Sequence, residues 1–105
     1  MAPYKGEGMM NLADVFNKFE DEYLKFERVV NKRSNRSDLH AFLLLDSLVP
    51  SDRETDMVAC AEHDEIWLGI DPEDLAAVAS EEQILELVRC GVRYDTDVES
   101  LAMFT

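Results

Sequence analysis

The stretch Ile66–Gly91, IWLGIDPEDLAAVASEEQILELVRCG, decides how the second half of the chain folds. Its first five residues form a β-branched and aromatic run, which is typical of a strand. Asp71 directly precedes Pro72, and this pair predicts a helix N-cap followed by a proline at the first helical position. Ser80 and Gln83 have the spacing of a capping box, which predicts a second helix. The closing glycine favours a helix stop, because a left-handed residue is needed there.

The segments on either side of this stretch predict a small antiparallel sheet. Met57–Ala61 is a short apolar run, and with Ile66–Ile70 it predicts a β-hairpin that has residues 63–64 near its tip. After the helix stop, Val92–Tyr94 begins a third strand and Leu101–Phe104 forms a fourth, with a polar turn between them. We therefore expect two hairpins that share one sheet.

The first half of the chain is predicted to be helical. Residues 1–10 contain two glycines and a proline and have no apolar period, so we expect a flexible leader. Asn11 is a good N-cap for a helix of about five turns that reaches Val30. A second helix is predicted over Asp38–Leu48; it has little polar face and should be largely buried. A short polar loop would join the two helices into an antiparallel hairpin.

An aromatic stripe distinguishes the first predicted helix. Its apolar residues recur at spacings of three and four, and they include Phe16, Phe19, Tyr23 and Phe26. Core packing explains such a stripe, but aromatic residues are also enriched at interfaces. Several elements compete for the core of one small domain, so part of the stripe is predicted to join two copies of the chain as a homodimer.

Composition sets the broad class of protein. The 105 residues suit one domain, and a hydrophobic content of 47% favours a folded chain over disorder. The longest apolar run, Ala41–Leu45, is too short to cross a bilayer, and the N-terminus has no apolar region of the kind that secretory signals carry. We therefore expect a cytoplasmic protein that does not bind membranes and whose two cysteines are reduced.

Charge is distributed unevenly and restricts the partners. The chain has a net charge of −13; residues 1–36 hold 7 basic and 6 acidic side chains, and residues 37–105 hold 3 and 17. The second half should repel nucleic acid and anionic lipid. A basic protein surface, a cation or a basic patch on another copy would suit it, although acidic surfaces also serve only to keep small proteins in solution.

Carboxylates supply the candidate partner-binding residues. Each of them also has a local explanation, because negative charge in the first turn of a helix is stabilising. No nucleotide-binding or hydrolase motif is present, so we expect no catalytic residue and no cofactor. The predicted partner-binding side chains are Glu62, Asp64, Glu65, Glu73, Asp74, Glu81, Glu82 and Glu86.

Four soft ligands define an alternative class of site. Cys60 and His63 lie among carboxylates at the first hairpin, and Cys90 and His40 lie in predicted helices. A zinc site would need all four, but no CxxC or HxxxH pair anchors one, and a solvated hairpin tip is the simpler interpretation. Strand alternation could point Cys60 into the core. Cys90 follows a helix C-terminus, which disfavours a thiolate, so we expect a core cysteine rather than a nucleophile.

Two pieces of sequence carry a resemblance. AEHDEIWLGID (Ala61–Asp71) and LVRCGVRYD (Leu87–Asp95) make the chain similar to small acidic orphan accessory proteins of bacteriophages and prophages. The resemblance implies an accessory role in the cytoplasm of a host cell and transfers no site residue. Among such proteins, those that inhibit host defence or transcription often act as acidic binders that mimic nucleic acid, so the resemblance favours such a role for this chain.

These observations lead to one expectation of fold and two of function. The fold class is α+β: an N-terminal helical hairpin, then a β-hairpin, two short helices and a second β-hairpin, all in a single domain over residues 11–105. The first functional hypothesis is a non-enzymatic acidic module that binds a basic surface of another protein, in its sharper form as a nucleic-acid mimic. The alternative is a small enzyme or metal-binding protein that uses Cys60, His63 and nearby carboxylates.

Overall fold

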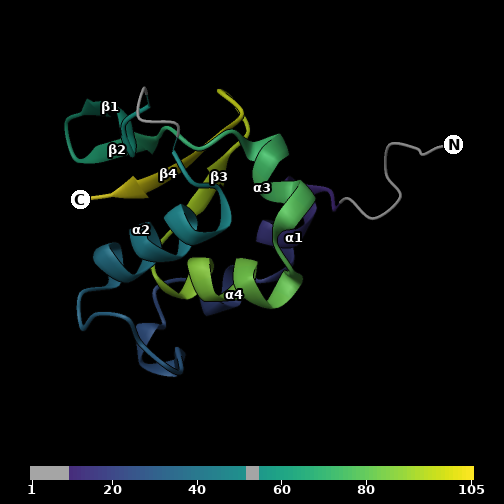
Figure 1. The fold of residues 1–105 in the computed structure, drawn as a ribbon, viewed down its shortest axis with the longest axis vertical. Coiled ribbons are helices and arrows are strands. Elements are labelled where there is room, and N and C mark those ends of the chain that lie inside the picture. Colours follow the sequence, from purple (N-terminus) through teal and green to yellow (C-terminus); the bar gives the residue numbers. More distant parts are fainter. Residues whose placement is uncertain (1–9, 52–54) are drawn as a thin grey trace, which may run out of the picture.

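The computed structural model describes residues 10–51 and 55–105, and it has the expected α+β class. The predicted leader therefore lies, except for Met10, outside the described residues. The elements in chain order are α1 Leu12–Lys18, two 3₁₀ turns (η1 Glu20–Glu22 and η2 Phe26–Arg28), α2 Ser37–Leu48, β1 Val58–Glu62, β2 Glu65–Leu68, α3 Pro72–Val78, α4 Glu81–Arg89, β3 Arg93–Asp95 and β4 Ser100–Phe104 (Figure 1).

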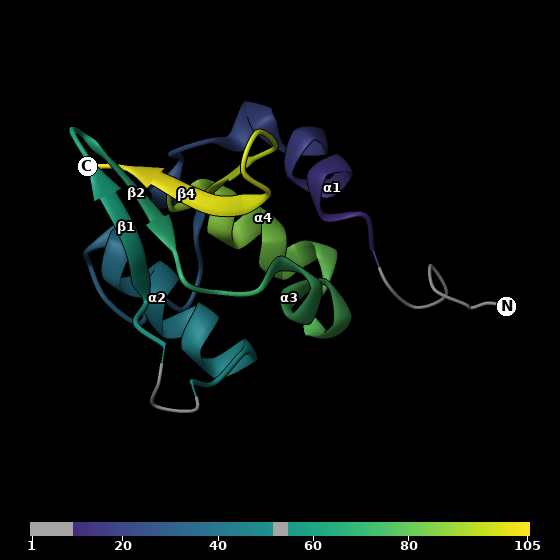
Figure 2. The same cartoon turned by 90° about the horizontal axis from the view of Figure 1, so that it is seen from above.

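The four strands form one antiparallel sheet in the order β1-β2-β4-β3. The two predicted hairpins therefore meet through β2 and β4, where Ile66 pairs with Met103 and Trp67 with Ala102. Seen from above, the sheet lies over α2 and α4, so these helices cover one of its faces (Figure 2). The molecule thus has a sheet layer and a helical layer, with the core between them.

Side-chain alternation gives the sheet one buried and one open face. Leu68, Leu101 and Met103 belong to the core cluster, and Ile66 packs against it. The opposite face carries an interacting set of larger side chains. The Arg93 guanidinium pairs with Glu65 and lies 4.3 Å from the centre of the Phe104 ring. The Trp67 indole donates a hydrogen bond of 3.1 Å to Asp95. The open face is therefore held together by polar and cation–π contacts.

Local signals place α3 and α4 where the sequence predicts them. The Asp71 side chain accepts a hydrogen bond from the backbone N–H of Glu73, directly after the turn from β2. Ser80 and Gln83 form both hydrogen bonds of the capping box. Gly91 ends α4 with φ 98°, and hydrogen bonds from Gly91 to Val88 and from Val92 to Leu87 complete a Schellman motif. These caps therefore fix where α3 and α4 begin and where α4 ends.

The prediction of one long N-terminal helix is wrong. The helix ends at Lys18, and residues 20–28 form two separate 3₁₀ turns. Leu24 has φ 65°, a left-handed conformation that costs a non-glycine residue roughly 1–2 kcal/mol. Its backbone N–H donates to Val88, and its side chain covers Gly91. Tertiary contacts of this kind override the helical pattern, because the bent chain can follow α4 and a straight helix cannot.

The bend also separates the helices that were expected to form a hairpin. α1 packs against α4 and β3, whereas α2 packs against α3 and α4. α2 itself begins one residue before the predicted start and ends at the predicted Leu48. It is less buried than expected, because Leu39 and Leu43 face solvent while Leu44 and Leu45 fill the core. Within the described residues, no helix is long and apolar enough to cross a membrane.

Candidate functional site

Four of the predicted carboxylates lie in the first turns of α3 and α4. These helical carboxylates are Glu73 and Asp74 on α3, and Glu81 and Glu82 on α4; all four are exposed. The caps that start the two helices position them, and the helix dipoles stabilise their charge. Glu81 forms a salt bridge with Lys18 at the end of α1, with 2.7 Å between Glu81 Oε1 and Lys18 Nζ. The other three form no ion pair with a described residue, so their charge is directed at solvent.

Two more predicted carboxylates lie at the turn between β1 and β2. These hairpin carboxylates, Glu62 and Asp64, are exposed and flank His63, which has φ 57°. The prediction that residues 63–64 form the hairpin tip is confirmed, because Glu62 pairs with Glu65 across a two-residue turn. Neither hairpin carboxylate is ion-paired among the residues that the structure describes. The hairpin therefore carries a second group of uncompensated negative charge, on an element other than the helices.

Glu65 and Glu86 are bound within the protein instead. Both are partly buried, with side chains 21% and 28% exposed. Glu65 pairs with Arg93 on the open face of the sheet, and Glu86 accepts a hydrogen bond of 2.5 Å from the His40 ring. The sequence predicts that Glu86 binds a partner, but its carboxylate is already bound by a buried histidine from another helix. These two carboxylates are less available to a partner than the other six.

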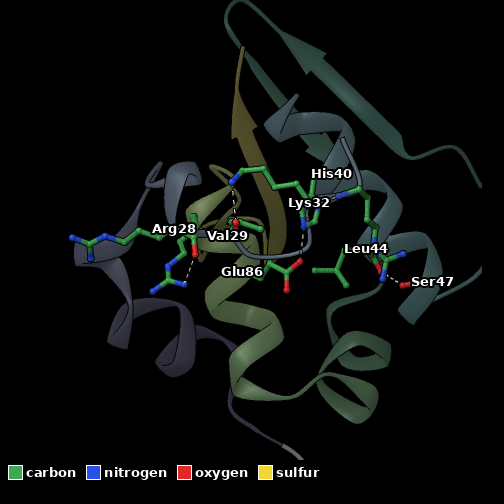
Figure 3. A network of polar contacts seen from close by, with 9 residues as sticks. Arg28, Val29, Lys32, His40, Leu44, Ser47 and Glu86 are labelled. Carbon is green, nitrogen blue, oxygen red and sulfur yellow. Dashed lines mark hydrogen bonds and ion pairs between the residues drawn. The ribbon is translucent and has the colours of Figure 1, made fainter. Parts of the chain in front are cut away.

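The bond between His40 and Glu86 belongs to a polar network that joins α2, α4 and the segment before α2 (Figure 3). His40 is fully buried, and its Nδ1 accepts a hydrogen bond of 3.0 Å from the backbone N–H of Arg33. An accepting nitrogen carries no proton, so the ring proton is on Nε2 and is donated to Glu86. The His40 and Phe26 rings pack edge-to-face, and the Lys32 ammonium donates a hydrogen bond to the carbonyl of Val29. This network fixes the basic segment 29–36 on the helical layer.

Sequence reasoning missed a cleft that is lined by four aspartates. This aspartate cleft, of about 200 Å³, is formed where the end of α2, the approach to β1 and the start of α3 meet. Asp46, Asp56, Asp71 and Asp74 line it, and none of its described lining residues is lysine or arginine. Three of these aspartates lie in loops or at helix ends far apart in the sequence, so no local pattern could have grouped them. Asp74 belongs to both the cleft and the helical carboxylates.

The aromatic residues predicted to form an oligomer interface are used largely inside the chain. Phe16 is only 6% exposed and stacks against Tyr94 of β3, with ring centres 6.3 Å apart. Phe19, Tyr23 and Phe26 are partly buried and pack against the core cluster. The core explanation of the stripe therefore accounts for much of its surface. The homodimer stays a prediction, with less apolar area available to support it.

The two cysteines have opposite environments. Cys60 is exposed, so the expectation that strand alternation buries it is wrong. Cys60 lies opposite Trp67, on the open face of the sheet, and all five side chains of β1 are exposed. Cys90 is buried, as expected for a core cysteine. Burial and the neighbouring Glu86 carboxylate raise the pKa of its thiol to about 12, which disfavours the thiolate that nucleophilic catalysis requires.

The alternative metal site finds no support in the described part of the chain. There, no three His, Cys, Asp or Glu side chains lie together in a way that could hold a metal ion. Of the four soft ligands, His40 and Cys90 are buried in the helical layer, whereas Cys60 and His63 are exposed on the first hairpin. Comparisons of the chain with protein family models, with curated proteins and with solved structures find no match. The site must therefore be interpreted from its own geometry.

Proposed function

We propose that this protein is a non-enzymatic interaction module that binds a basic surface of another protein through its exposed carboxylates. The observation that carries the proposal is that five predicted carboxylates are exposed and form no ion pair with a described residue. They are Glu62, Asp64, Glu73, Asp74 and Glu82. Leaving like charges unpaired on a small domain opposes its folding slightly, and a basic partner would neutralise them.

The aspartate cleft adds a place where such a partner can insert a side chain. Its four aspartates come from the end of α2, the approach to β1 and the start of α3, and Asp74 connects it with the helical carboxylates. A lysine or arginine that enters the cleft would exchange water for charge-assisted hydrogen bonds, which are about twice as strong as neutral ones. Basic side chains around it could contact the helical carboxylates at the same time. Together these features favour a protein surface over a free cation as the ligand.

Mimicry of nucleic acid is the sharper form of the proposal. It is supported by the resemblance to phage accessory proteins and by the negative charge of residues 37–105. A mimic would occupy the nucleic-acid site of its partner, so partner binding and nucleic-acid binding would exclude each other. Competition with duplex DNA and with RNA would test this: a captured partner should be released by one of them. A ternary complex would contradict mimicry and leave the broader proposal standing.

The experiment for the broader proposal is quantitative affinity capture from a lysate of the natural host, with matched charge variants. One bait neutralises three helical carboxylates (Glu73→Gln, Asp74→Asn, Glu82→Gln), and a second neutralises the hairpin (Glu62→Gln, Asp64→Asn). The control bait carries Glu20→Gln, Asp21→Asn and Glu27→Gln, which remove as many negative charges as the helical bait and one more than the hairpin bait, at exposed positions in the nearly neutral half.

We expect a partner that the wild type and the control retain and that at least one of the other baits loses. Thermal unfolding checks that each bait is folded, since each first-turn carboxylate contributes about 0.3–1 kcal/mol to its helix. Capture that is identical for all four baits would contradict the proposal.

A further inference from the structure

β1 is an uncovered edge of the sheet. Among the described residues it has a single neighbouring strand, β2, and Figure 2 shows it at the outer margin of the sheet. The other edge strand, β3, has only three residues and packs against α1. All five side chains of β1 are exposed. An edge strand carries backbone N–H and C=O groups that no neighbour satisfies, so β1 is the edge where another strand can be added.

The hairpin geometry identifies which backbone groups are free. Glu62 and Glu65 close a two-residue turn, and this closing pair in an antiparallel hairpin is the hydrogen-bonded one. Pairs alternate along the ladder, so Ala61, opposite Ile66, directs its N–H and C=O away from β2. An irregularity between Val58 and Cys60 confines the regular part of the edge to Cys60–Glu62. An added strand would therefore be short and centred on Ala61.

The composition of β1 differs from that of protected edges. Natural edge strands are commonly blocked by lysine or proline, but β1 has the sequence VACAE and contains neither. Ala59, Cys60 and Ala61 are small, so they leave the backbone accessible from the side. Within β1, the irregularity near Val58 protects the end away from the turn, and the charge of Glu62 protects the end at the turn against acidic or apolar strands.

Charge at the turn selects the kind of strand that fits. Glu62 is within β1, Asp64 is two residues further on, and neither is ion-paired among the described residues. Glu65 is already neutralised by Arg93. A lysine or arginine opposite Glu62 would form a favourable cross-strand pair. A second copy of β1 would instead bring its own hairpin carboxylates to the same edge, and like charges across strands are destabilising.

We propose that the β1 edge adds a short extended segment of the partner, in which basic residues alternate with small or apolar ones. This inference rests on the proposed function and deepens it: backbone hydrogen bonds at Ala61 provide the docking, and the hairpin carboxylates provide the preference for basic side chains. The helical carboxylates lie on α3 and α4 rather than on this hairpin, so they are a separate contact region.

A defined peptide tests the inference without knowledge of the natural partner. The probe is the acetylated and amidated heptapeptide Thr-Lys-Val-Lys-Val-Lys-Thr, titrated into isotopically labelled protein at low salt. Two control peptides separate the contribution of backbone hydrogen bonds from that of the basic side chains. One has alternate backbone amides N-methylated, which keeps the charge and removes donors, and the other has glutamate in place of lysine. Binding is followed by amide chemical shifts, and amide hydrogen exchange is measured at saturation.

We expect shifts centred on Cys60–Asp64, slower exchange at the Ala61 amide, and binding about tenfold weaker for the N-methylated peptide, because it cannot complete the ladder. The Ala61→Pro variant should weaken binding in the same way, since it removes the outward N–H; the N-methylated peptide gives the same information if that variant does not fold. Equal binding of the lysine and N-methylated peptides, or shifts confined to α3 and α4, would overturn the inference and leave the proposed function standing. If the glutamate peptide bound as tightly as the lysine peptide, or if the lysine peptide did not bind, the result would count against both the inference and the proposed function.

Discussion

Removal of the His40 ring should destabilise the fold far more than neutralisation of its carboxylate partner. His40 is the one buried polar or charged side chain of the described residues, and it connects two helices with the segment before α2. In His40→Leu, the backbone N–H of Arg33 and the Glu86 carboxylate both lose their partner. The N–H is partly buried and costs about 1–3 kcal/mol when unsatisfied, whereas Glu86 can recover water. We expect a loss of about 3 kcal/mol when the lost charge-assisted bond is included.

Glu86→Gln separates the contribution of the charge from that of the bond. The glutamine side chain retains an oxygen that can accept the Nε2–H, so only the charge assistance is lost. We expect a cost of about 1 kcal/mol. Glu82→Gln, on the same helix but exposed and not ion-paired among the described residues, is the matched control and should stay within about 0.5 kcal/mol of wild type.

Urea unfolding at neutral pH measures all three changes as shifts of the midpoint at constant slope. Nuclear magnetic resonance of the imidazole nitrogens gives an independent check, because the hydrogen bonds place the proton on Nε2. The reasoning would be refuted if His40→Leu were as stable as the wild type. A ring protonated only on Nδ1 would also refute it.

Four further predictions follow from the structure. Gly69→Ala should lower the free energy of unfolding by about 1–3 kcal/mol, because the new Cβ would lie 2.2 Å from the carbonyl oxygen of Asp56. An unchanged midpoint in urea would be inconsistent with this packing. A thiol reagent should label Cys60 in the native protein and reach Cys90 only on unfolding, since burial raises the Cys90 pKa to about 12; equal rates would disprove the assignment. The hydrogen bond from the Trp67 indole lowers the pKa of the Asp95 carboxyl, so the ionised carboxylate stabilises the fold above pH 3.8 and this contribution is lost as the pH falls further. The stability of Asp95→Asn should therefore depend less steeply on pH in this acidic range. Light scattering at micromolar concentration tests the predicted homodimer, and a mass of one chain would rule it out.

The parts of the fold that the sequence predicts depend on neighbouring residues. Asp71 with Pro72, the Ser80 capping box and the glycine at position 91 each satisfy backbone groups within one turn, so they act in the same way in almost any tertiary context. The hairpin tip is predictable for a similar reason, because two β-prone runs flank a short polar turn. These elements also carry all six exposed partner-binding candidates, and of these six only Glu81 forms a salt bridge with a described residue.

The parts that sequence reasoning missed depend on residues far apart in the chain. The period of three and four between residues 12 and 30 predicts a helix, but contacts of Leu24 with Val88 and Gly91 bend the chain instead. His40 and Glu86 are 46 residues apart, so their bond leaves no local signal. The same is true of the aspartate cleft. Cys60 is exposed because it lies opposite Trp67 on the open face of the sheet, and alternation along a single strand does not specify which face is open.

The most direct test of the central claim is the salt dependence of the affinity for the captured partner. Titration calorimetry with the wild type, the helical variant (Glu73→Gln, Asp74→Asn, Glu82→Gln), the hairpin variant and the matched control would cover about 0.1 M to about 1 M salt. Over that range the screening length falls from about 10 Å to about 3 Å. We expect the wild-type and control affinities to fall at least about tenfold, and the dependence to be shallower for the variant that lacks the contacting carboxylates. An affinity that salt leaves unchanged, or one slope shared by all four proteins, would contradict an interaction through these carboxylates.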